Sequence, residues 1–332
     1  MKAIIYERYG APDVLRVADV AQPVPGDDDI LIRVRAVEAT KADCELRAFK
    51  FSVKWFWLPL RLAIGVTRPR RQILGGYFAG EVVSHGTNAD EFPVGEHVFG
   101  ATGLAFGAYG AFVAVPARNT VITKPKNMSF AEAAAVPLGG LNALHFMRLA
   151  KIRAGDSVLI NGAGGSIGAH AVQIAKAKGA EVTGVDSAAK EEFLRRMGVD
   201  HFIDYQRENF RRMGRSYDVV FDMVPNGSYS GAVNVLKPGG RYLSGNPRLW
   251  VMFRTLLTNW LTSKTASFAF ARETREELSA LKTMIEDGAI KPIVDRILPI
   301  DQAADAHRLV ESEQRRGAIV IEFDKALPSA GA

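Results

Sequence analysis

The stretch that decides the fold is Asp156–Lys176, with the sequence DSVLINGAGGSIGAHAVQIAK. Its apolar run, Ser157–Ile160, suits a strand that is buried on both faces. A glycine cluster follows, and from Ala169 the apolar residues resume at helical spacing. A strand, a glycine turn and a helix in succession are the context that a dinucleotide-binding site requires.

The glycines of this turn have separate expected tasks. Gly162 allows the tight turn, Gly165 lets the backbone approach a pyrophosphate, and Gly168 lets the helix lie close to the strand. The phosphates would lie over the N–H groups and the positive dipole end of the helix. The expected cofactor-binding residues of the turn are Gly162, Gly164, Gly165, Ser166, Ile167 and Gly168.

A second strand is predicted at 181–185, and Asp186 ends it about 20 residues beyond the glycines, where a ribose-binding carboxylate is expected. Such a carboxylate accepts hydrogen bonds from both ribose hydroxyls of NADH and repels the 2′-phosphate of NADPH. Ser187 and Lys190 follow, and the lysine could neutralise part of this repulsion. We therefore expect an NAD(P)H cofactor, with NADH favoured and dual use still open.

The rest of the chain changes texture near residue 125. Before it, short alternating segments with proline and glycine turns predict an antiparallel β domain. After the capping box Ser129–Glu132, strands and helices alternate, which predicts a doubly wound parallel sheet and an α/β fold class. The predicted strands are 3–7, 14–20, 30–39, 79–84, 97–100, 110–116, 158–161, 181–185, 201–203, 218–222, 240–244, 293–298 and 318–322, and the predicted later helices are 273–287 and 302–311.

Composition excludes several classes of protein. A chain of 332 residues with 48% hydrophobic and 23% charged residues is a globular protein with room for two domains. The net charge of +6 suits an anionic ligand, but the basic residues are scattered, so no nucleic-acid partner is expected. Cys44 is the only cysteine, which excludes internal disulfides and a multi-cysteine zinc site. The start shows no signal-peptide organisation, so we expect a cytoplasmic location.

The string from Gly155 to Lys176 resembles the signature of the quinone oxidoreductase (zeta-crystallin-like) branch of the medium-chain dehydrogenases/reductases. Ser166 departs from that signature, which usually has a second adjacent glycine there. The resemblance extends over nearly the whole chain and implies a Rossmann doubly wound parallel sheet plus a smaller GroES-like β-barrel domain. It also implies a discontinuous catalytic domain, residues 1–124 and 272–332, around a dinucleotide-binding domain, residues 125–271.

Zinc-dependent relatives hold their metal with an early cysteine and with the histidine of a Gly-His-Glu motif. Thr40 lies where that cysteine would be, and Gly76 and Tyr77 replace the histidine and the glutamate. Neither threonine nor glycine is a plausible zinc ligand. The six histidines are dispersed along the chain. The resemblance therefore indicates a zinc-free member with no metal ligands.

The absence of zinc ligands limits the substrates that the protein is expected to reduce. Hydride that reaches an isolated carbonyl leaves a localised alkoxide, whereas hydride that reaches a quinone or a conjugated enone leaves a delocalised enolate that hydrogen bonds can stabilise. We expect a reductase of quinones or α,β-unsaturated ketones and aldehydes, the substrate class that the resemblance also implies. A zinc-independent alcohol or carbonyl dehydrogenase and a non-catalytic NAD(P)H-binding protein are the alternatives.

Two hydroxyl groups are candidate catalytic donors to the developing oxyanion, those of Tyr77 and Thr40. Both residues occupy positions that belong to the zinc site in metal-dependent relatives. The alternative is that Tyr77 only packs against the nicotinamide and that Thr40 only caps a turn. Residue types alone do not separate these two roles.

Two apolar segments, 51–64 and 249–261, each contain two tryptophans. Both are too short to span a bilayer, which needs about 20 apolar residues. They could pack on the domain cleft or on a partner subunit, or they could form an apolar rim for lipophilic substrates or for peripheral contact with a membrane. Residues 265–270 could form an edge strand, and such strands are rarely left bare. With the resemblance, this indicates a homodimer.

Overall fold

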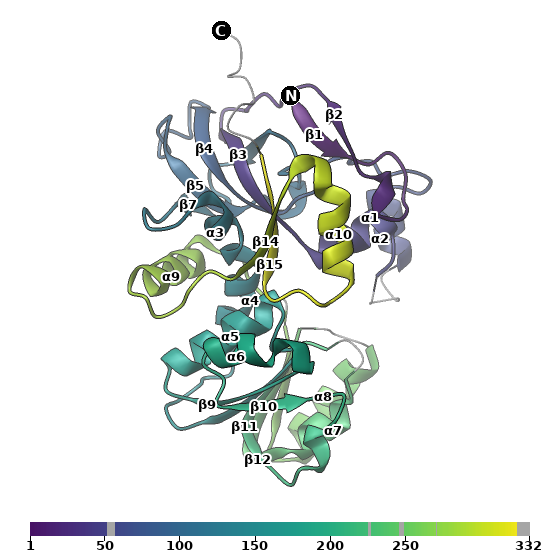
Figure 1. Cartoon of the computed structure of the whole chain (residues 1–332), viewed down its shortest axis with the longest axis vertical. Coiled ribbons are helices and arrows are strands. Elements are labelled where there is room, and N and C mark those ends of the chain that lie inside the picture. Colours follow the sequence, from purple (N-terminus) through teal and green to yellow (C-terminus); the bar gives the residue numbers. More distant parts are fainter. Residues whose placement is uncertain (52–56, 225–226, 246–248, 270, 324–332) are drawn as a thin grey trace. The chain divides into compact units, whose positions relative to one another are not determined.

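The computed structural model describes residues 1–51, 57–224, 227–245, 249–269 and 271–323. The chain divides into two compact units (Figure 1). The first comprises Met1–Leu138, Glu273–Glu286 and Pro292–Ala332, and the second comprises Gly139–Arg272 and Asp287–Lys291. The first boundary between the units lies inside helix α4 (Val136–Leu149), beyond residue 125, where the sequence pattern changes. The residues between these two points already have the α/β sequence pattern but still belong to the first unit by their contacts.

The second unit contains a six-stranded sheet in which every neighbouring pair is parallel. The strand order is β10 (His201–Asp204), β9 (Glu181–Asp186), β8 (Ser157–Asn161), β11 (Tyr217–Asp222), β12 (Leu236–Ser244) and β13 (Thr265–Phe268). Counted from β8 in chain order, this is 3-2-1-4-5-6, the order of dinucleotide-binding doubly wound sheets. The direction of winding reverses between β8 and β11, and this confirms the predicted fold class.

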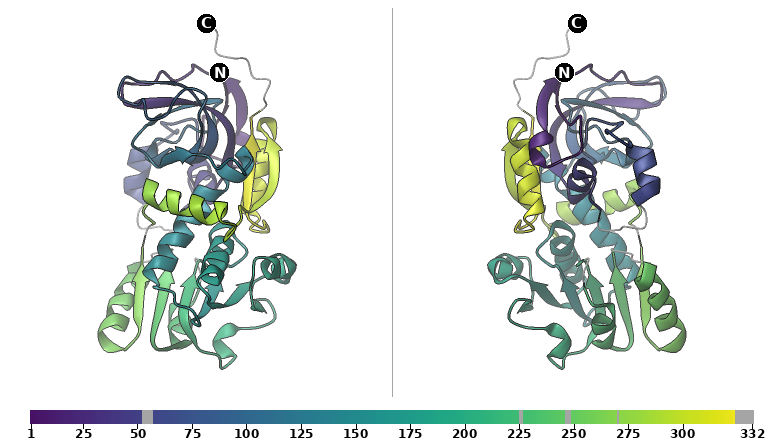
Figure 2. Two further views of the ribbon diagram at one scale, coloured as in Figure 1. Left: turned by 90° about the vertical axis from the view of Figure 1, so that its left-hand side faces the viewer. Right: turned by 90° about the vertical axis from the view of Figure 1, so that its right-hand side faces the viewer.

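Helices cover this sheet, as Figure 2 shows, and they explain its continuous apolar strands. Val158, Leu159 and Ile160 are fully buried because both faces of β8 are covered. The helices of the unit after α4 are α5 (Ser166–Ala177), α6 (Glu191–Arg196), α7 (Tyr229–Asn234) and α8 (Leu249–Leu261).

The first unit is built around the long strand β3 (Asp29–Ala39), which pairs with three other strands. Its seven-stranded sheet runs in the order β14-β15-β3-β4-β5-β7, with β6 also paired to β3. A separate two-stranded sheet joins β1 and β2. The remaining bounds are β1 (Lys2–Ile5), β2 (Arg16–Asp19), β4 (Tyr77–His85), β5 (His97–Ala101), β6 (Phe112–Pro116), β7 (Val121–Thr123), β14 (Val294–Pro299) and β15 (Ala318–Glu322).

The last described helix and strand of the chain belong to the first unit. Strand β15 pairs antiparallel with β3, with Ile319 opposite Ala39, and Figure 1 shows the yellow end of the chain beside the purple strands of its beginning. Helix α10 (Ala303–Glu311) buries Ala306 and Val310 in the same hydrophobic core. The first unit is therefore discontinuous in sequence.

The structure adds elements that the sequence pattern did not predict. Helix α1 (Lys41–Ala48) follows β3 directly, β7 lies at the other edge of the sheet, and α3 (Phe130–Ala134) ends after one turn before α4 begins. Helix α9 (Arg275–Glu286) begins two residues later than predicted. These elements are too short for their periodicity to be distinctive.

Helix α8 exposes its apolar side and buries two threonines, Thr255 and Thr258. Its exposed apolar residues are Leu249, Trp250, Phe253, Leu256, Leu257, Trp260 and Leu261. Helix α2 (Trp57–Ile64) also exposes Trp57, whereas residues 52–56 of the same segment lie outside the described residues, as does Phe270 of the expected edge strand. None of the helices in the described ranges has the length and apolar character needed to cross a bilayer.

Candidate active site

The glycine turn begins at the carboxyl end of β8, beside the point where the strand order reverses. Gly162 has a φ of 85°, a conformation that favours glycine, and its N–H donates to Val185 O at 3.0 Å. In doubly wound sheets, ligands bind outside the carboxyl ends of the strands at this reversal. The turn therefore lies where a dinucleotide is expected.

The other glycines of the turn differ in what surrounds them. A Cβ at Gly168 would lie 2.2 Å from Gly162 O, so this glycine permits the close approach of α5 and the turn. A Cβ at Gly164 would lie 2.4 Å from Lys190 Cδ. At Gly165 the nearest atom, Gly162 O, would be 3.9 Å away, so that side of the turn is open to a phosphate group.

The first turn of α5 is suited to bind an anion. Its N-cap residue is Gly165, which provides no side-chain hydrogen bond, and the first turn contains no acidic residue. Ile167 lies in that turn, and Ser166, which precedes it, has a buried hydroxyl without a hydrogen-bond partner in the described part of the chain. The open side of Gly165 and the uncapped helix end fit the pyrophosphate of a dinucleotide.

Asp186 holds the turn from the neighbouring strand. Its Oδ2 accepts from Gly164 N at 2.7 Å, and its Oδ1 accepts from Ser187 N at 2.9 Å. Lys190 Nζ lies 3.2 Å from Oδ1, and both side chains are buried, with Asp186 8% and Lys190 6% exposed. The carboxylate therefore orders the glycine turn, a role that the sequence did not reveal, and Lys190 lies close enough to neutralise its charge locally.

A second polar group at the strand reversal was not predicted. Asn161 at the end of β8 donates from Nδ2 to Asp222 Oδ1 at 2.9 Å, and Asp222 is the last residue of β11. Burial raises the pKa of the Asp222 carboxyl. The available signal was a polar residue directly after a buried apolar run, at the strand end where ligands bind.

Thr40 serves as the N-cap of α1. Its Oγ1 donates to Asp43 Oδ2 at 2.6 Å and accepts from Asp43 N at 3.1 Å, in a capping box. The other oxygen of Asp43 accepts from Gly75 N at 3.0 Å, which ties α1 to the start of β4. The one O–H of Thr40 is thus used inside the protein, and burial raises the pKa of Asp43.

Tyr77 begins β4, two residues after Gly75, at the end of the ladder where β3 finishes. Its hydroxyl donates to Glu273 Oε1 at 2.5 Å, and both side chains are half-buried. Burial, with the nearby Glu273 carboxylate, raises the pKa of Tyr77, so its phenol is neutral at physiological pH. Glu273, which precedes α9, joins the candidate site only in the folded chain, and no sequence pattern pointed to it because it lies 196 positions from Tyr77.

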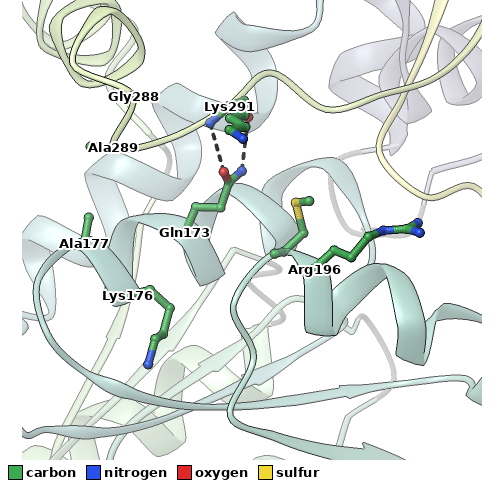
Figure 3. Close-up of a pocket in the computed structure, with 8 residues that line it drawn as sticks. Gln173, Lys176, Ala177, Arg196, Gly288, Ala289 and Lys291 are labelled. Atoms are coloured by element: carbon green, nitrogen blue, oxygen red, sulfur yellow. Dashed lines mark hydrogen bonds between the residues drawn. The ribbon is translucent and has the colours of Figure 1, made fainter.

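Figure 3 shows a hollow in the second unit that is separate from the glycine turn. Gln173 and Lys176, near the end of α5, line it together with Arg196 and residues 288–291. The Gln173 amide bonds to the backbone of Lys291 through both its oxygen and its nitrogen, at 2.9 and 3.1 Å. This hollow lies by the carboxyl end of α5, at the opposite end of the helix from the glycine turn.

Among the described residues, no group of three or more His, Cys, Asp or Glu side chains is arranged to hold a metal ion. Gly76 provides no side chain, and a Cβ there would meet nothing within 4 Å.

A glycine turn on a doubly wound parallel sheet, together with a separate β domain, defines a two-domain dehydrogenase or reductase architecture. Two family models match the chain, the alcohol dehydrogenase GroES-like domain over residues 26–126 and the zinc-binding dehydrogenase over residues 197–321. The relatives that follow match nearly the entire chain.

The chain is 31% identical to a 2-methylene-furan-3-one reductase of Solanum lycopersicum, over 97% of this chain and 79% of that protein. It is also 31% identical to a chloroplastic NADPH-dependent alkenal/one oxidoreductase of Arabidopsis thaliana, with the same shares. The solved structure of the quinone oxidoreductase from Coxiella burnetii has a TM-score of 0.86 at 28% identity, over 98% of this chain and 99% of that one. The chain belongs to the medium-chain dehydrogenase/reductase family, in its quinone oxidoreductase-like branch, and is an oxidoreductase.

Proposed function

We propose that this protein reduces quinones or α,β-unsaturated ketones and aldehydes with NAD(P)H and without zinc. The observation that carries the proposal is the set of side chains where β3 ends and β4 begins. Tyr77 offers an O–H there, while Thr40 and Gly76 offer no metal ligand. The names of the relatives, an alkenal/one oxidoreductase and a quinone oxidoreductase, support the same substrate class.

The cofactor-binding residues are the glycine turn and its support. The N–H groups at the start of α5 bind the pyrophosphate, and Gly165 leaves room for it. Asp186, Ser187 and Lys190 lie on the ribose side of the turn. When bound, the reduced nicotinamide supplies a hydride for the β-carbon of the conjugated substrate.

Tyr77 is the proposed catalytic residue. Its neutral phenol can donate an O–H to the oxyanion that forms on the substrate, and such a positioned donor typically contributes about 10²–10⁴-fold in rate. Thr40 has a supporting role in this proposal, because its hydroxyl is used to hold Asp43. Asp43 in turn fixes the backbone of Gly75 just before Tyr77.

Zinc independence is part of the proposal and can be tested directly. We expect purified protein to contain far less than one zinc per chain, and chelators to leave its activity unchanged. The reason is that Thr40 and Gly76 cannot ligate the metal. Elemental analysis, with chelator-treated enzyme assayed in parallel, checks this, and one tightly held zinc per chain would overturn it.

The central experiment measures NAD(P)H oxidation in the presence of quinones, enones, enals and plain ketones. We expect turnover with the conjugated substrates and at most slow turnover with the plain ketones. Alcohol-dependent reduction of NAD(P)⁺ would instead support a zinc-independent alcohol dehydrogenase. Cofactor binding without turnover of any acceptor would support the non-catalytic alternative.

Two further expectations belong to this proposal. A cytoplasmic location agrees with a single cysteine, Cys44, whose thiol is free and buried. A homodimer agrees with the edge position of β13 and the exposed apolar side of α8. The small lipophilic substrate class is also compatible with the apolar surface of α8.

A further inference from the structure

Tyr77 has one proton to give, and the structure shows where that proton points. The phenol O–H donates to Glu273 Oε1 at 2.5 Å, which is the geometry expected for a carboxylate acceptor. While Glu273 is ionised, this bond occupies the only O–H of Tyr77. A phenol in that state can accept a hydrogen bond from a substrate but cannot donate one.

Glu273 is held in place independently of Tyr77. Its backbone carbonyl accepts from Thr120 Oγ1 at 2.7 Å, beside β7. Two residues further on, Arg275 makes a bidentate pair with Glu91 at 2.8 and 3.0 Å and donates from Nε to Asn119 O at 2.9 Å. These contacts all lie within the first unit, and they fix the start of α9 on the β domain so that the Glu273 carboxyl group meets the Tyr77 phenol.

We propose that Glu273 is a positioning residue for Tyr77: its protonated carboxyl group donates to the phenol oxygen and so frees the Tyr77 O–H for the substrate. This inference rests on the proposed function, in which Tyr77 protonates the reduced conjugated substrate. When the Glu273 carboxyl group is protonated, it has an O–H of its own. It can then donate a hydrogen bond to the Tyr77 oxygen instead of accepting one from it, because a protonated acid both donates and accepts.

The proton balance of the step is simple. The Tyr77 O–H bond breaks as an O–H bond forms on the substrate oxyanion, which leaves a phenolate. The phenolate then takes the proton of the Glu273 carboxyl group, and the carboxylate regains a proton from water. The residual enol converts to the ketone or aldehyde in solution or in the site.

The surroundings favour the protonated form of Glu273. Burial raises the pKa of its carboxyl group, and the Tyr77 hydrogen bond opposes that rise only in part. Two other acidic groups on neighbouring elements, Glu38 near the end of β3 and Asp43 in α1, raise the pKa of Tyr77. Two bases flank Glu273 along the chain, Arg272 and Arg275, and Arg275 is paired with Glu91.

The test compares pH profiles of kcat for NAD(P)H oxidation with a simple enone. In the wild-type protein, kcat should fall about tenfold per pH unit once the pH exceeds the pKa of Glu273, because the Tyr77 O–H then donates its hydrogen bond to the ionised carboxylate and is not available to the substrate. Glu273→Gln should remove this fall and keep kcat near the acidic plateau, since the amide N–H donates to the phenol oxygen at every pH. Glu276→Gln, at an exposed acid in the first turn of α9, is the matched control and should keep the wild-type profile.

Two more variants complete the series. Tyr77→Phe should lower kcat by about 100-fold or more and remove the pH dependence, with a smaller change in KM. Glu273→Ala should lower kcat through poor orientation of the phenol and should also show no pH limb. Thermal shifts with and without cofactor verify that each variant is folded.

The outcomes separate this inference from the proposed function. If the wild-type protein turns over no conjugated substrate, the proposed function fails. If it is active but Glu273→Gln keeps the wild-type pH profile, only the inference is wrong. Should Glu273→Gln not fold, Tyr77→Phe decides: a retained pH limb in that variant would overturn the inference, and its loss would support it.

Discussion

Among individual residues, Gly165 and Gly168 have different surroundings and different expected roles within one turn. Gly168 lies against the backbone of Gly162, whereas Gly165 faces open space. A valine at Gly165 would therefore fill the place of the phosphate without disturbing its neighbours. A valine at Gly168 would disturb the turn itself, because its Cβ would be 2.2 Å from a carbonyl oxygen.

We expect Gly165→Val to abolish cofactor binding while its thermal stability without cofactor stays near that of the wild type. Gly168→Val should lose both cofactor binding and thermal stability. Thermal-shift titration with NADH and NADPH measures both quantities, because a ligand that binds only the folded protein raises the melting temperature. A Gly165→Val protein that is stabilised by cofactor like its parent would show that the turn is not the site.

Asp186 decides the expected preference between NADH and NADPH. At an effective dielectric of about 20, two unit charges about 4 Å apart repel by roughly 4 kcal/mol, and solvent and Lys190 reduce that figure. We expect NADH to be preferred, although the Arabidopsis relative is named for NADPH. Asp186→Ser should shift the ratio of kcat/KM for the two cofactors toward NADPH by about tenfold or more.

Asp186→Asn is the control for this substitution, because the carboxylate also accepts the N–H of Gly164. Asparagine keeps an acceptor for the turn while it removes the negative charge. If both variants shift the preference, charge is the cause. A wild-type protein that strongly prefers NADPH, with neither variant changing the ratio, would exclude contact between Asp186 and the ribose.

At the element scale, α8 and β13 form an unusual surface. Strand β13 is the last strand of its sheet and pairs only with β12 within the described ranges. Helix α8 packs against β13 and turns its apolar side outward, with Trp260 82% exposed. An apolar helix beside an edge strand is a surface that proteins normally cover.

We expect a homodimer in which a second copy covers α8 and β13. Leu256→Glu, on the exposed side of α8, should convert the dimer to a monomer. Leu62→Glu, on the exposed part of α2, should leave the dimer intact. Light scattering at micromolar protein concentration measures the oligomeric state. A monomeric wild-type protein that sediments with lipid vesicles through α8 would instead support the alternative of peripheral membrane contact.

At the scale of the whole molecule, the first unit is expected to lose stability in acid. His307 of α10 is fully buried, where its ring lies 2.9 Å from Tyr109 Oη and 3.4 Å from Cys44 Sγ. Burial, aided by the charge of Arg47, lowers the pKa of His307 from 6.5 to about 3. Below pH 6.5 the unfolded chain therefore binds a proton that the folded protein excludes.

The free energy of unfolding should therefore fall as the pH drops from 6.5 toward 3, by at most about 1.4 kcal/mol per pH unit from this group. His307→Gln should be less stable at neutral pH but should lose less stability on acidification. Denaturant unfolding at several pH values tests this. Stability curves of the two proteins that run parallel between these pH values would contradict the assignment to His307.

Features of this protein that depend on local pattern could be predicted from the amino-acid sequence. The strand, glycine turn and helix of Asp156–Lys176 predicted the dinucleotide-binding sheet, and the structure has that fold. Local pattern was sufficient because strand and helix periodicity and glycine positions are properties of neighbouring residues. That Thr40 and Gly76 cannot ligate zinc is also an inference from residue type, because ligand chemistry belongs to the side chain, and the zinc-free assignment stays a prediction.

Contacts between residues that are distant in the sequence became visible only in the folded structure. It placed Glu273 against Tyr77, β15 beside β3 and the Asp186 carboxylate on the N–H of Gly164. It also showed that the hydroxyl of Thr40 is used by its own helix. Pairings of this kind follow from how sheets and helices pack around a common core, and no periodicity within the chain encodes which partner each side chain will find.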